Sequence, residues 1–304
     1  MIYKARFESA ELKILRFLNK RMTLSDKDKR HYLTLKKGYE GEVLFDRKTE
    51  KLTCDCLILN DLLFKVNNTT FQIDSLIITR NLLFLNEVKN FEGDYYYNNE
   101  LDRLYKRPKN DEYLNPLNQL SRSESLLRQL LQYIGYHFTI EAWVIFINPE
   151  FTLYQAPLDK PFILPTQVNS YIKKLDIIPQ GLSAKHKMLA DKLLSLHKEK
   201  NPYTTLPPYA YDQLKKGQTC AICDSFVLSI RGNKCVCEDC VHEELVASAV
   251  LRSVDELRLL FPNRKITTNL VFEWCVIFES KKRIARILEK NFKIVGYGQW
   301  AYYE

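Results

Sequence analysis

The chain has 304 residues, of which 46% are hydrophobic and 27% charged, a composition typical of a folded protein of about two domains. No apolar stretch approaches the roughly 18 residues that a membrane helix needs. Charged residues interrupt the first apolar segment, which is not the pattern of a secretory signal. We therefore expect a cytoplasmic protein with no membrane partner.

The net charge of +8 is unevenly distributed, because the first 37 residues carry eleven lysines and arginines against four acidic residues. A basic segment of this kind suits a polyanionic partner. A solvated basic face that binds nothing is equally compatible with this pattern.

Hydrophobic periodicity predicts the order of the elements. Residues 7–22 space their apolar side chains like one helical face, and a second helix is expected from about Tyr39. Strand-like runs follow between residues 57 and 90, and a tyrosine-rich strand or loop follows Gly93. Pro116 opens a long amphipathic helix, so we expect a mixed sheet with a crossover helix. The later elements are a strand at 142–148, a helical segment at 165–200 and a linker at 201–209.

The segment Glu87-Val88-Lys89 contains candidate residues for a metal-binding site. In a strand, Glu87 and Lys89 share one face while Val88 enters the core. If the hairpin closes through residues 80–81, the numbers of paired residues sum to 161, and Asp74 lies opposite Glu87. Two facing carboxylates repel each other, and a divalent cation such as Mg²⁺, which prefers oxygen ligands, would remove that repulsion.

The neighbouring charged residues extend this hypothesis. The positive charge of Lys89 can stabilise negative charge on a phosphate in the transition state. Glu42, expected near the start of a helix, can add a third carboxylate. The alternative is a solvated strand face with an ordinary Glu–Lys pair, and the paired Asp74 favours the site over it.

Four motifs occur in a fixed order along this part of the chain. The motifs are G-x-x-G-E at Gly38–Glu42, I-D-x-L-I-I at Ile73–Ile78, E-V-K-N at Glu87–Asn90 with the following Gly93, and N-P-x-x-Q at Asn115–Gln119. Together they resemble the nuclease-related domain, NERD, a branch of the PD-(D/E)xK nuclease superfamily, over roughly residues 35–150.

The resemblance implies an α/β fold with a PD-(D/E)xK-like core and a mixed sheet. It also implies Mg²⁺ (or Mn²⁺) as cofactor, DNA as substrate, and hydrolysis of the phosphodiester by metal-activated water. No motif position is lost, which argues against an inactive copy, although a non-catalytic DNA-binding or regulatory protein that retains the fold is the alternative. The implied roles are metal ligands at Asp74, Glu87 and the Val88 carbonyl, a catalytic lysine at Lys89, an acidic residue at Glu42 and a polar residue at Gln119.

Five of the eight cysteines lie between residues 220 and 240, which in a cytoplasmic protein indicates metal binding rather than disulfides. Two Cys-x₂-Cys pairs can supply a tetrahedral, structural zinc site in a small zinc ribbon. Either Cys235 or His242 can replace one ligand. The expected ligands are Cys220, Cys223, Cys237 and Cys240.

The last 60 or so residues predict three helices followed by a hairpin, which resembles a winged helix-turn-helix. The third helix is rich in basic residues, as expected of a helix that contacts DNA. A helical packing or dimerisation module with a solvated basic face is the alternative. The candidate DNA-binding residues are Lys281, Lys282, Arg283 and Arg286.

These patterns predict four successive regions. They are a NERD-type nuclease domain at 1–160, a helical linker at 161–215, a zinc ribbon at 216–243 and a winged-helix-like DNA-binding domain at 244–304.

Overall fold

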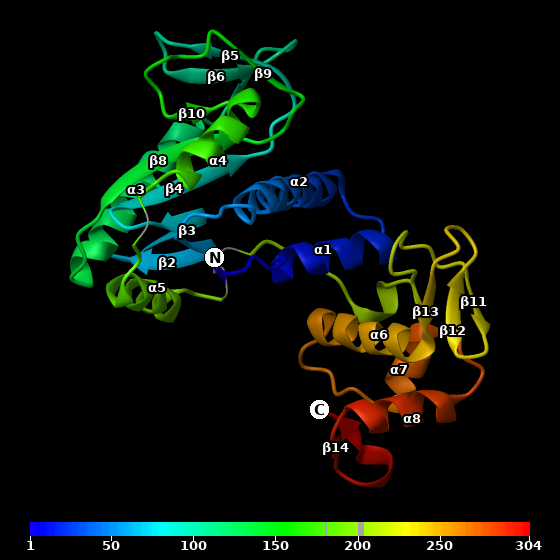
Figure 1. Ribbon diagram of the computed structural model, residues 1–304. Helices are drawn as coiled ribbons and strands as arrows, with labels where there is room; N and C mark the ends of the chain where they lie inside the picture. The colour runs from blue at the N-terminus through cyan, green and yellow to red at the C-terminus, as the bar shows by residue number, and fades with distance from the viewer. Residues whose placement is uncertain (180, 200–203) are drawn as a thin grey trace. The chain divides into compact units, whose positions relative to one another are not determined.

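The computed structural model describes residues 1–179, 181–199 and 204–304, which separate into two compact units (Figure 1). Residues 1–8 and 33–204 form the first unit, and residues 9–32 and 205–304 form the second. The helix expected at 7–22 therefore groups with the C-terminal residues, because its apolar side chains, such as that of Leu18, pack in the second unit's core.

A six-stranded mixed sheet in the order β1-β2-β3-β4-β8-β10 forms the centre of the first unit. Strands β2, β3 and β4 are antiparallel, whereas β8 runs parallel to β4 and to β10. Helix α3 lies between β4 and β8 in the chain and begins at Pro116, as predicted. The strands are β1 (Ile2–Lys4), β2 (Leu57–Val66), β3 (Thr69–Ile78), β4 (Leu82–Lys89), β8 (Thr139–Phe146) and β10 (Phe162–Ile163).

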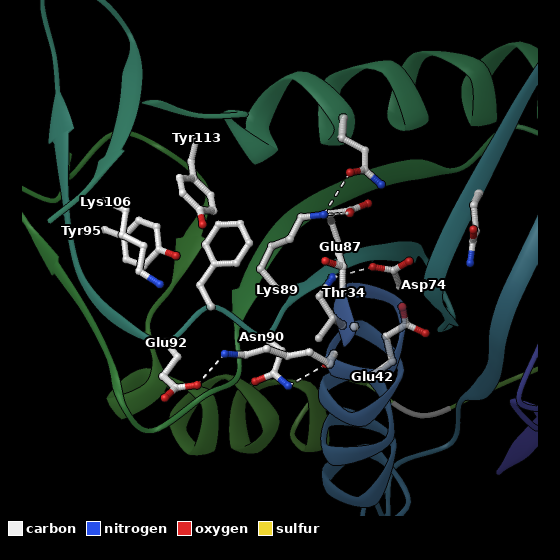
Figure 2. Close-up of a pocket in the computed structure, with 16 residues that line it drawn as sticks. Thr34, Glu42, Asp74, Glu87, Lys89, Asn90, Glu92, Tyr95, Lys106 and Tyr113 are labelled. Carbon is white, nitrogen blue, oxygen red and sulfur yellow. Dashed lines mark hydrogen bonds and ion pairs between the residues drawn. The ribbon is translucent and has the colours of Figure 1, made fainter. Parts of the chain in front are cut away.

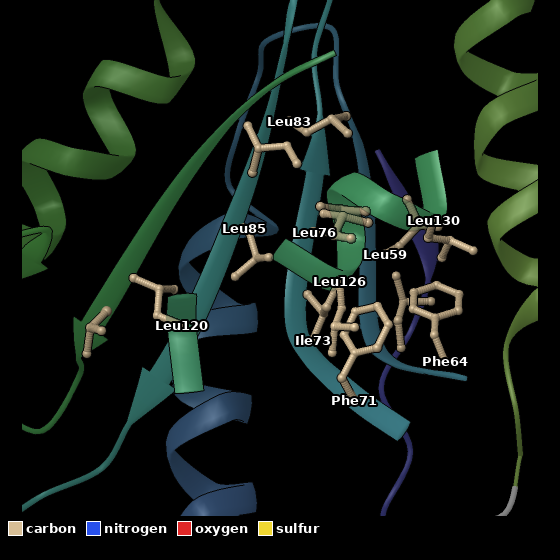
Figure 3. Close-up of a cluster of buried hydrophobic side chains, with 14 of the residues drawn as sticks. Leu59, Phe64, Phe71, Ile73, Leu76, Leu83, Leu85, Leu120, Leu126 and Leu130 are labelled. Atoms are coloured by element: carbon tan, nitrogen blue, oxygen red, sulfur yellow. The ribbon is translucent and has the colours of Figure 1, made fainter. Parts of the chain in front are cut away.

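Helices cover both faces of this sheet, and each face has its own cluster of buried apolar side chains. Leu120 and Leu126 of α3 pack in the first cluster with Ile73 and Leu85 of the sheet (Figure 3), and α5 contributes to the same cluster. Helices α2 and α4 contribute to the second cluster. The helices are α2 (Asp26–Thr49), α3 (Pro116–Tyr133), α4 (Val168–Asp176) and α5 (Ala184–Leu196), with a 3-10 turn at Pro165–Gln167.

A local irregularity in the sheet places Asp74. Ile73 and Leu76 both belong to the first cluster although they are three residues apart, so the regular alternation of strand faces shifts between them. The neighbouring strand β2 shifts at the same level, where Asp61 has a left-handed backbone with φ of 55°. Asp74 therefore lies at a kink shared by two strands.

A second, four-stranded sheet in the order β7-β6-β5-β9 completes the first unit. In β5 the side chains of Tyr95 and Tyr97 are buried, and the intervening Tyr96 lies on the opposite face. The tyrosine-rich segment predicted after Gly93 is thus a strand. The strands are β5 (Gly93–Asn98), β6 (Arg103–Lys106), β7 (Asp111–Tyr113) and β9 (Phe151–Tyr154).

The second unit packs helices around the fully buried Trp274. Arg21 and Glu256 form a buried ion pair of 2.7 Å in this core, and the Thr267 hydroxyl accepts a hydrogen bond from Leu270 N at 3.1 Å as a helix cap. Three helices and a short hairpin follow each other as predicted, and their assignment as a winged helix stays a prediction. The elements are α1 (Ala10–Arg21), β11 (Leu228–Arg231), β12 (Lys234–Cys237), β13 (Glu243–Leu245), α6 (Val246–Leu260), α7 (Thr268–Cys275), α8 (Lys281–Asn291), β14 (Ile294–Val295) and β15 (Tyr302–Tyr303), with 3-10 turns at Tyr211–Gln213 and Gly298–Trp300.

The predicted start of the second helix near Tyr39 is wrong, because α2 begins at Asp26. The Ser25 hydroxyl accepts a hydrogen bond from Asp28 N at 3.2 Å, and acidic residues in the first turn favour a helix start. Glu42 consequently lies in the C-terminal half of α2 rather than near its start. Within the described residues, no helix combines the length and the apolar character needed to cross a membrane.

Candidate active site

Glu87 and Lys89 share one face of β4, as predicted. Lys89 Nζ donates hydrogen bonds to Glu87 Oε1 at 2.7 Å and to Gln119 Oε1, on α3, at 3.0 Å. Val88 points to the other face and packs in the second cluster. Because Glu87 is only 1% exposed, the alternative of a solvated strand face is excluded.

The predicted hairpin register is confirmed. Ser75 pairs with Asn86, so the numbers of the paired residues sum to 161 along this ladder. The ladder ends at that pair, and Asp74 lies just beyond it. There Asp74 Oδ2 accepts a hydrogen bond from the backbone N–H of Val88 at 2.8 Å, which holds the carboxylate at the Glu87 end of β4 (Figure 2).

Glu42 reaches the same place from α2 because of a close approach between helix and strand. A Cβ atom added at Gly41 would collide with the Asn90 side chain, so glycine is required for this packing. Asn90 Nδ2 also donates a hydrogen bond to the carbonyl of Lys37 at 2.7 Å. These two contacts fix α2 against the end of β4.

Arg6 is a site residue that the sequence analysis missed. Its guanidinium donates hydrogen bonds to Glu42, to Asp46 Oδ2 at 2.9 Å and to the carbonyl of Asp74 at 2.6 Å. The side chain is only 3% exposed, so it links α2 to β3 from inside the protein. In the sequence, Arg6 is one of many basic residues near the N-terminus, and no local pattern distinguishes it from the others.

The site holds more negative charge than its cations balance. Burial and the charge of Asp74 raise the pKa of Glu87 to about 8. Burial also raises the pKa of Asp74, although Lys89 and the Val88 N–H oppose the shift. For Glu42, burial and Asp74 raise the pKa against the opposing effect of Arg6. Such shifts arise where carboxylates share a poorly solvated site.

A hard divalent cation fits this donor set. Glu87 Oε2 is buried and has no hydrogen-bond partner among the described residues, so it retains free acceptor capacity next to Asp74. Buried polar atoms are normally paired, and Mg²⁺ is commonly bound by one or two carboxylates. The chemistry of Asp74 and Glu87 therefore suits Mg²⁺ or Mn²⁺.

These groups line a single cavity of about 390 Å³ (Figure 2). The residues that line the cavity include every predicted member of the site. Arg6 is not among them, and it contacts the site through Glu42. The predicted members are Glu42, Asp74, Glu87, Val88, Lys89 and Gln119.

Residues 37–147 match the family model described as the nuclease-related domain, NERD. The chain contains a NERD domain. The resemblance inferred from the four motifs is confirmed, and the domain implies a nuclease-related function. The NERD segment contains all six predicted site residues but not Arg6. No curated protein and no solved structure gives a significant match to the chain.

Outside the NERD domain, the two Cys-x₂-Cys pairs converge into one cluster that can bind zinc. The four sulfur atoms all lie within 4.8 Å of one another, and burial, which would raise the pKa of Cys237, is outweighed by backbone N–H groups that lower it to about 7. Cys235 instead packs in the apolar core, and neither it nor His242 belongs to the cluster. The cluster consists of Cys220, Cys223, Cys237 and Cys240.

The basic residues of α8 fall into two classes. Lys281 Nζ donates to Asn269 Oδ1 at 2.8 Å, and Arg283 donates to the carbonyl of Gly232 at 2.7 Å. Lys282 and Arg286 are exposed and form no hydrogen bond or ion pair with the described residues. Lys290, in the last turn of α8, is exposed and unpartnered among the described residues as well, so these three side chains are available to a ligand.

Proposed function

We propose that the chain is a Mg²⁺-dependent nuclease that hydrolyses phosphodiester bonds in DNA. The observation that carries this proposal is the carboxylate of Glu87, which gives one oxygen to Lys89 and keeps the other buried and unpaired beside Asp74. An ordinary structural ion pair does not leave such an oxygen, since an unpaired buried acceptor costs about 1–3 kcal/mol.

Asp74 and Glu87, with the Val88 carbonyl, would hold Mg²⁺ or Mn²⁺. When bound, the ion supplies Lewis-acid polarisation of the phosphate and lowers the pKa of a water molecule. Glu42 adds a third carboxylate, and its hydrogen bond with Arg6 keeps it at the cavity.

Lys89 supplies a fixed positive charge for the phosphate. Burial alone would lower the pKa of Lys89, but Glu87 and Asp74 outweigh it and the pKa is raised. The ammonium group therefore stays protonated at neutral pH and acts as a charge rather than as a base. Its hydrogen bonds to Glu87 and Gln119 hold it in place before substrate binds.

The second unit extends this proposal. A zinc ion at the four-cysteine cluster would have a structural role, because a site with four protein ligands has no open position for substrate. It would stabilise the hairpins around it. The exposed Lys282 and Arg286 of α8 would contact DNA phosphates. A cytoplasmic location stays a prediction that fits the free thiols.

A cleavage assay tests the catalytic proposal. Purified chain with Mg²⁺ is incubated with plasmid and with single-stranded DNA, and Lys89→Ala should lose about 10²–10³ in rate, as when one transition-state contact is removed. The control is Lys65→Ala, which removes an exposed lysine from β2 of the same sheet. Equal rates for Lys89→Ala and the wild type, or full activity in a chelator, would contradict the proposal. DNA binding without cleavage in Mg²⁺ or Mn²⁺ would instead support the non-catalytic alternative.

A further inference from the structure

The cavity has a second wall that the proposed chemistry does not use. Tyr95 and Tyr113 line the same cavity as Glu87 and Lys89 (Figure 2). Phe91 also lines it. The rings of Phe91 and Tyr95 are stacked with centroids 5.4 Å apart, and Tyr113 stands edge-on to Phe91 at 5.8 Å. An aromatic corner therefore faces the carboxylates across the cavity.

These rings differ in what a ligand can reach. Tyr95 is only 2% exposed and belongs to the core, whereas Phe91 and Tyr113 are half-buried at the cavity. An aromatic surface left open beside a charged site offers a ligand a flat apolar contact next to strong electrostatics. A nucleotide, with a planar base joined to a phosphate, has that combination of groups.

The charge at this end of the cavity fits the same ligand. Lys106 Nζ lies 5.4 Å from the centre of the Tyr95 ring; its charge helps to lower the pKa of Glu92, but it forms no ion pair within 4 Å among the described residues. Lys37, also at the cavity, is already paired with Glu92 at 2.5 Å. Lys106 is thus a cation beside the rings, with no direct ion pair among the described residues, that can contact a phosphate.

We propose that the base of an unpaired nucleotide beside the scissile phosphate packs into the corner formed by Phe91 and Tyr113, stacking on one ring and meeting the other edge-on, so that the substrate is single-stranded DNA. This inference rests on the proposed nuclease function and names its substrate class. A base within a duplex is covered by its neighbours on both faces, and exposing it costs unpairing and unstacking energy. A single strand offers its bases without that cost, and aromatic side chains are the usual platform for them.

The geometry sets the order of contacts along the strand. The scissile phosphate lies at Lys89 and the carboxylates, the adjoining base lies on the aromatic corner, and Lys106 contacts the next phosphate. Stacking of this kind does not require a particular base, because every base has an aromatic face. The chain therefore prefers single-stranded to duplex DNA but has no preference for a particular base sequence.

Binding measured without cleavage tests this inference. Full-length Lys89→Ala chain with Mg²⁺ is titrated with fluorescein-labelled oligothymidylate and with a hairpin duplex of the same length. Tyr113→Ala should weaken binding of the single strand by at least about fivefold, whereas Tyr113→Phe, which keeps the ring, should bind within about twofold of its parent. Phe91→Leu, which keeps an apolar side chain but no ring, is the second test, with thermal unfolding as the check on folding. Tyr133→Ala, which removes an 85% exposed tyrosine at the end of α3 and outside the cavity, is the control.

The outcomes separate this inference from the proposed function. Unchanged affinity for the single strand in both Tyr113→Ala and Phe91→Leu, or an equal loss of affinity for the duplex and the single strand in Tyr113→Ala, overturns the aromatic site even if the wild type cleaves DNA. An equal loss in Tyr113→Phe and Tyr113→Ala also overturns it, because the hydroxyl and not the ring would then be responsible. Ring-dependent binding of the single strand supports the inference. It does so even if the chain fails to cleave DNA, a result that would contradict the proposed nuclease function.

Discussion

Lys89 donates a hydrogen bond to Oε1 of Glu87 at 2.7 Å, while Oε2 of the same carboxylate is buried and has no hydrogen-bond partner among the described residues. Lys89 therefore balances only part of the negative charge that Glu87 shares with Asp74. Arg6 offsets a further part through Glu42, yet the pKa of Glu87 is still raised to about 8. The metal-free site thus favours the protonated carboxylate, and a bound cation would reverse that preference.

The stability of the metal-free protein should fall as the pH rises. Glu87 has a pKa of about 8 in the folded chain against 4.5 for an unperturbed glutamate, so the folded state retains a proton that the unfolded state releases. Its stabilising contribution is complete below pH 4.5 and is lost as the pH rises through about 8. Thermal unfolding without added divalent metal, followed across this range, should show the decline.

Added Mg²⁺ and one variant provide the controls for this pH dependence. The cation should raise the unfolding temperature most at the alkaline end, where the carboxylates are charged. Glu87→Gln, which cannot titrate, should flatten the decline and weaken the effect of Mg²⁺. A decline that is the same in Glu87→Gln as in the wild type would show that other groups cause it.

Gly41→Ala should disturb the site, because the new Cβ would collide with Asn90 and push α2 away from β4. We expect a lower unfolding temperature and a loss of cleavage. The control is Gly38→Ala in the same helix, where nothing lies within 4 Å of an added Cβ. Since alanine is favoured over glycine in a helix interior by about 0.5–1 kcal/mol, Gly38→Ala should be neutral or stabilising. Equal behaviour of the two variants would argue against the close approach.

Arg6→Ala should be strongly destabilising, because it leaves the buried carboxylate of Asp46 and the partly buried carboxylate of Glu42 without their cation. Breaking a buried ion pair in this way costs about 3–5 kcal/mol. The surface pair of Arg128 and Glu124 is the comparison, and Arg128→Ala should change stability by no more than about 1 kcal/mol. Urea unfolding measures both, and a small effect of Arg6→Ala would mean that water replaces the guanidinium.

The sequence predicted the parts of this site that depend on local geometry. The face shared by Glu87 and Lys89 follows from strand alternation, and the hairpin register brings Asp74 to the Glu87 end of β4. The kink at which Asp74 lies was not predicted, because it breaks the regular alternation of the strand. Arg6 could not be predicted, because its partner Asp74 is 68 residues away in the chain and only the parallel pairing of β1 with β2 brings them together. The Ser25 cap was a readable signal for the start of α2.

The four-cysteine cluster should bind about one zinc ion per chain, measurable by elemental analysis of protein purified without chelators. Cys223→Ser should remove the metal and lower the stability of the second unit, because a structural zinc ion supplies folding energy. Cys235→Ser is the control, since this neighbouring thiol lies outside the cluster and zinc should be retained. Loss of zinc in Cys235→Ser but not in Cys223→Ser would reassign the ligands.

Helix α8 should contribute to DNA binding through Lys282 and Arg286, two of its exposed basic side chains that have no partner among the described residues. Lys282 and Arg286 are one helical turn apart and share a face, while Ile284 and Leu288 are fully buried on the inner side. Each phosphate contact releases counterions. The logarithm of the binding constant for duplex DNA therefore falls with the logarithm of the salt concentration, with a slope of about 0.9 per contact.

The double variant Lys282→Ala/Arg286→Ala should therefore weaken duplex binding at every sequence and reduce the salt slope by up to about 2. The measurement is a salt titration of the full-length chain carrying Lys89→Ala, without divalent metal, so that no cleavage interferes. Its control is Lys173→Ala/Lys174→Ala, which removes the same charge from an exposed position on α4. Because overall charge changes equally in both variants, a difference in slope between them reports contacts at α8. An equal, small reduction in both would mean that α8 is a packing or dimerisation helix with a solvated basic face, and that DNA is bound by the NERD domain alone.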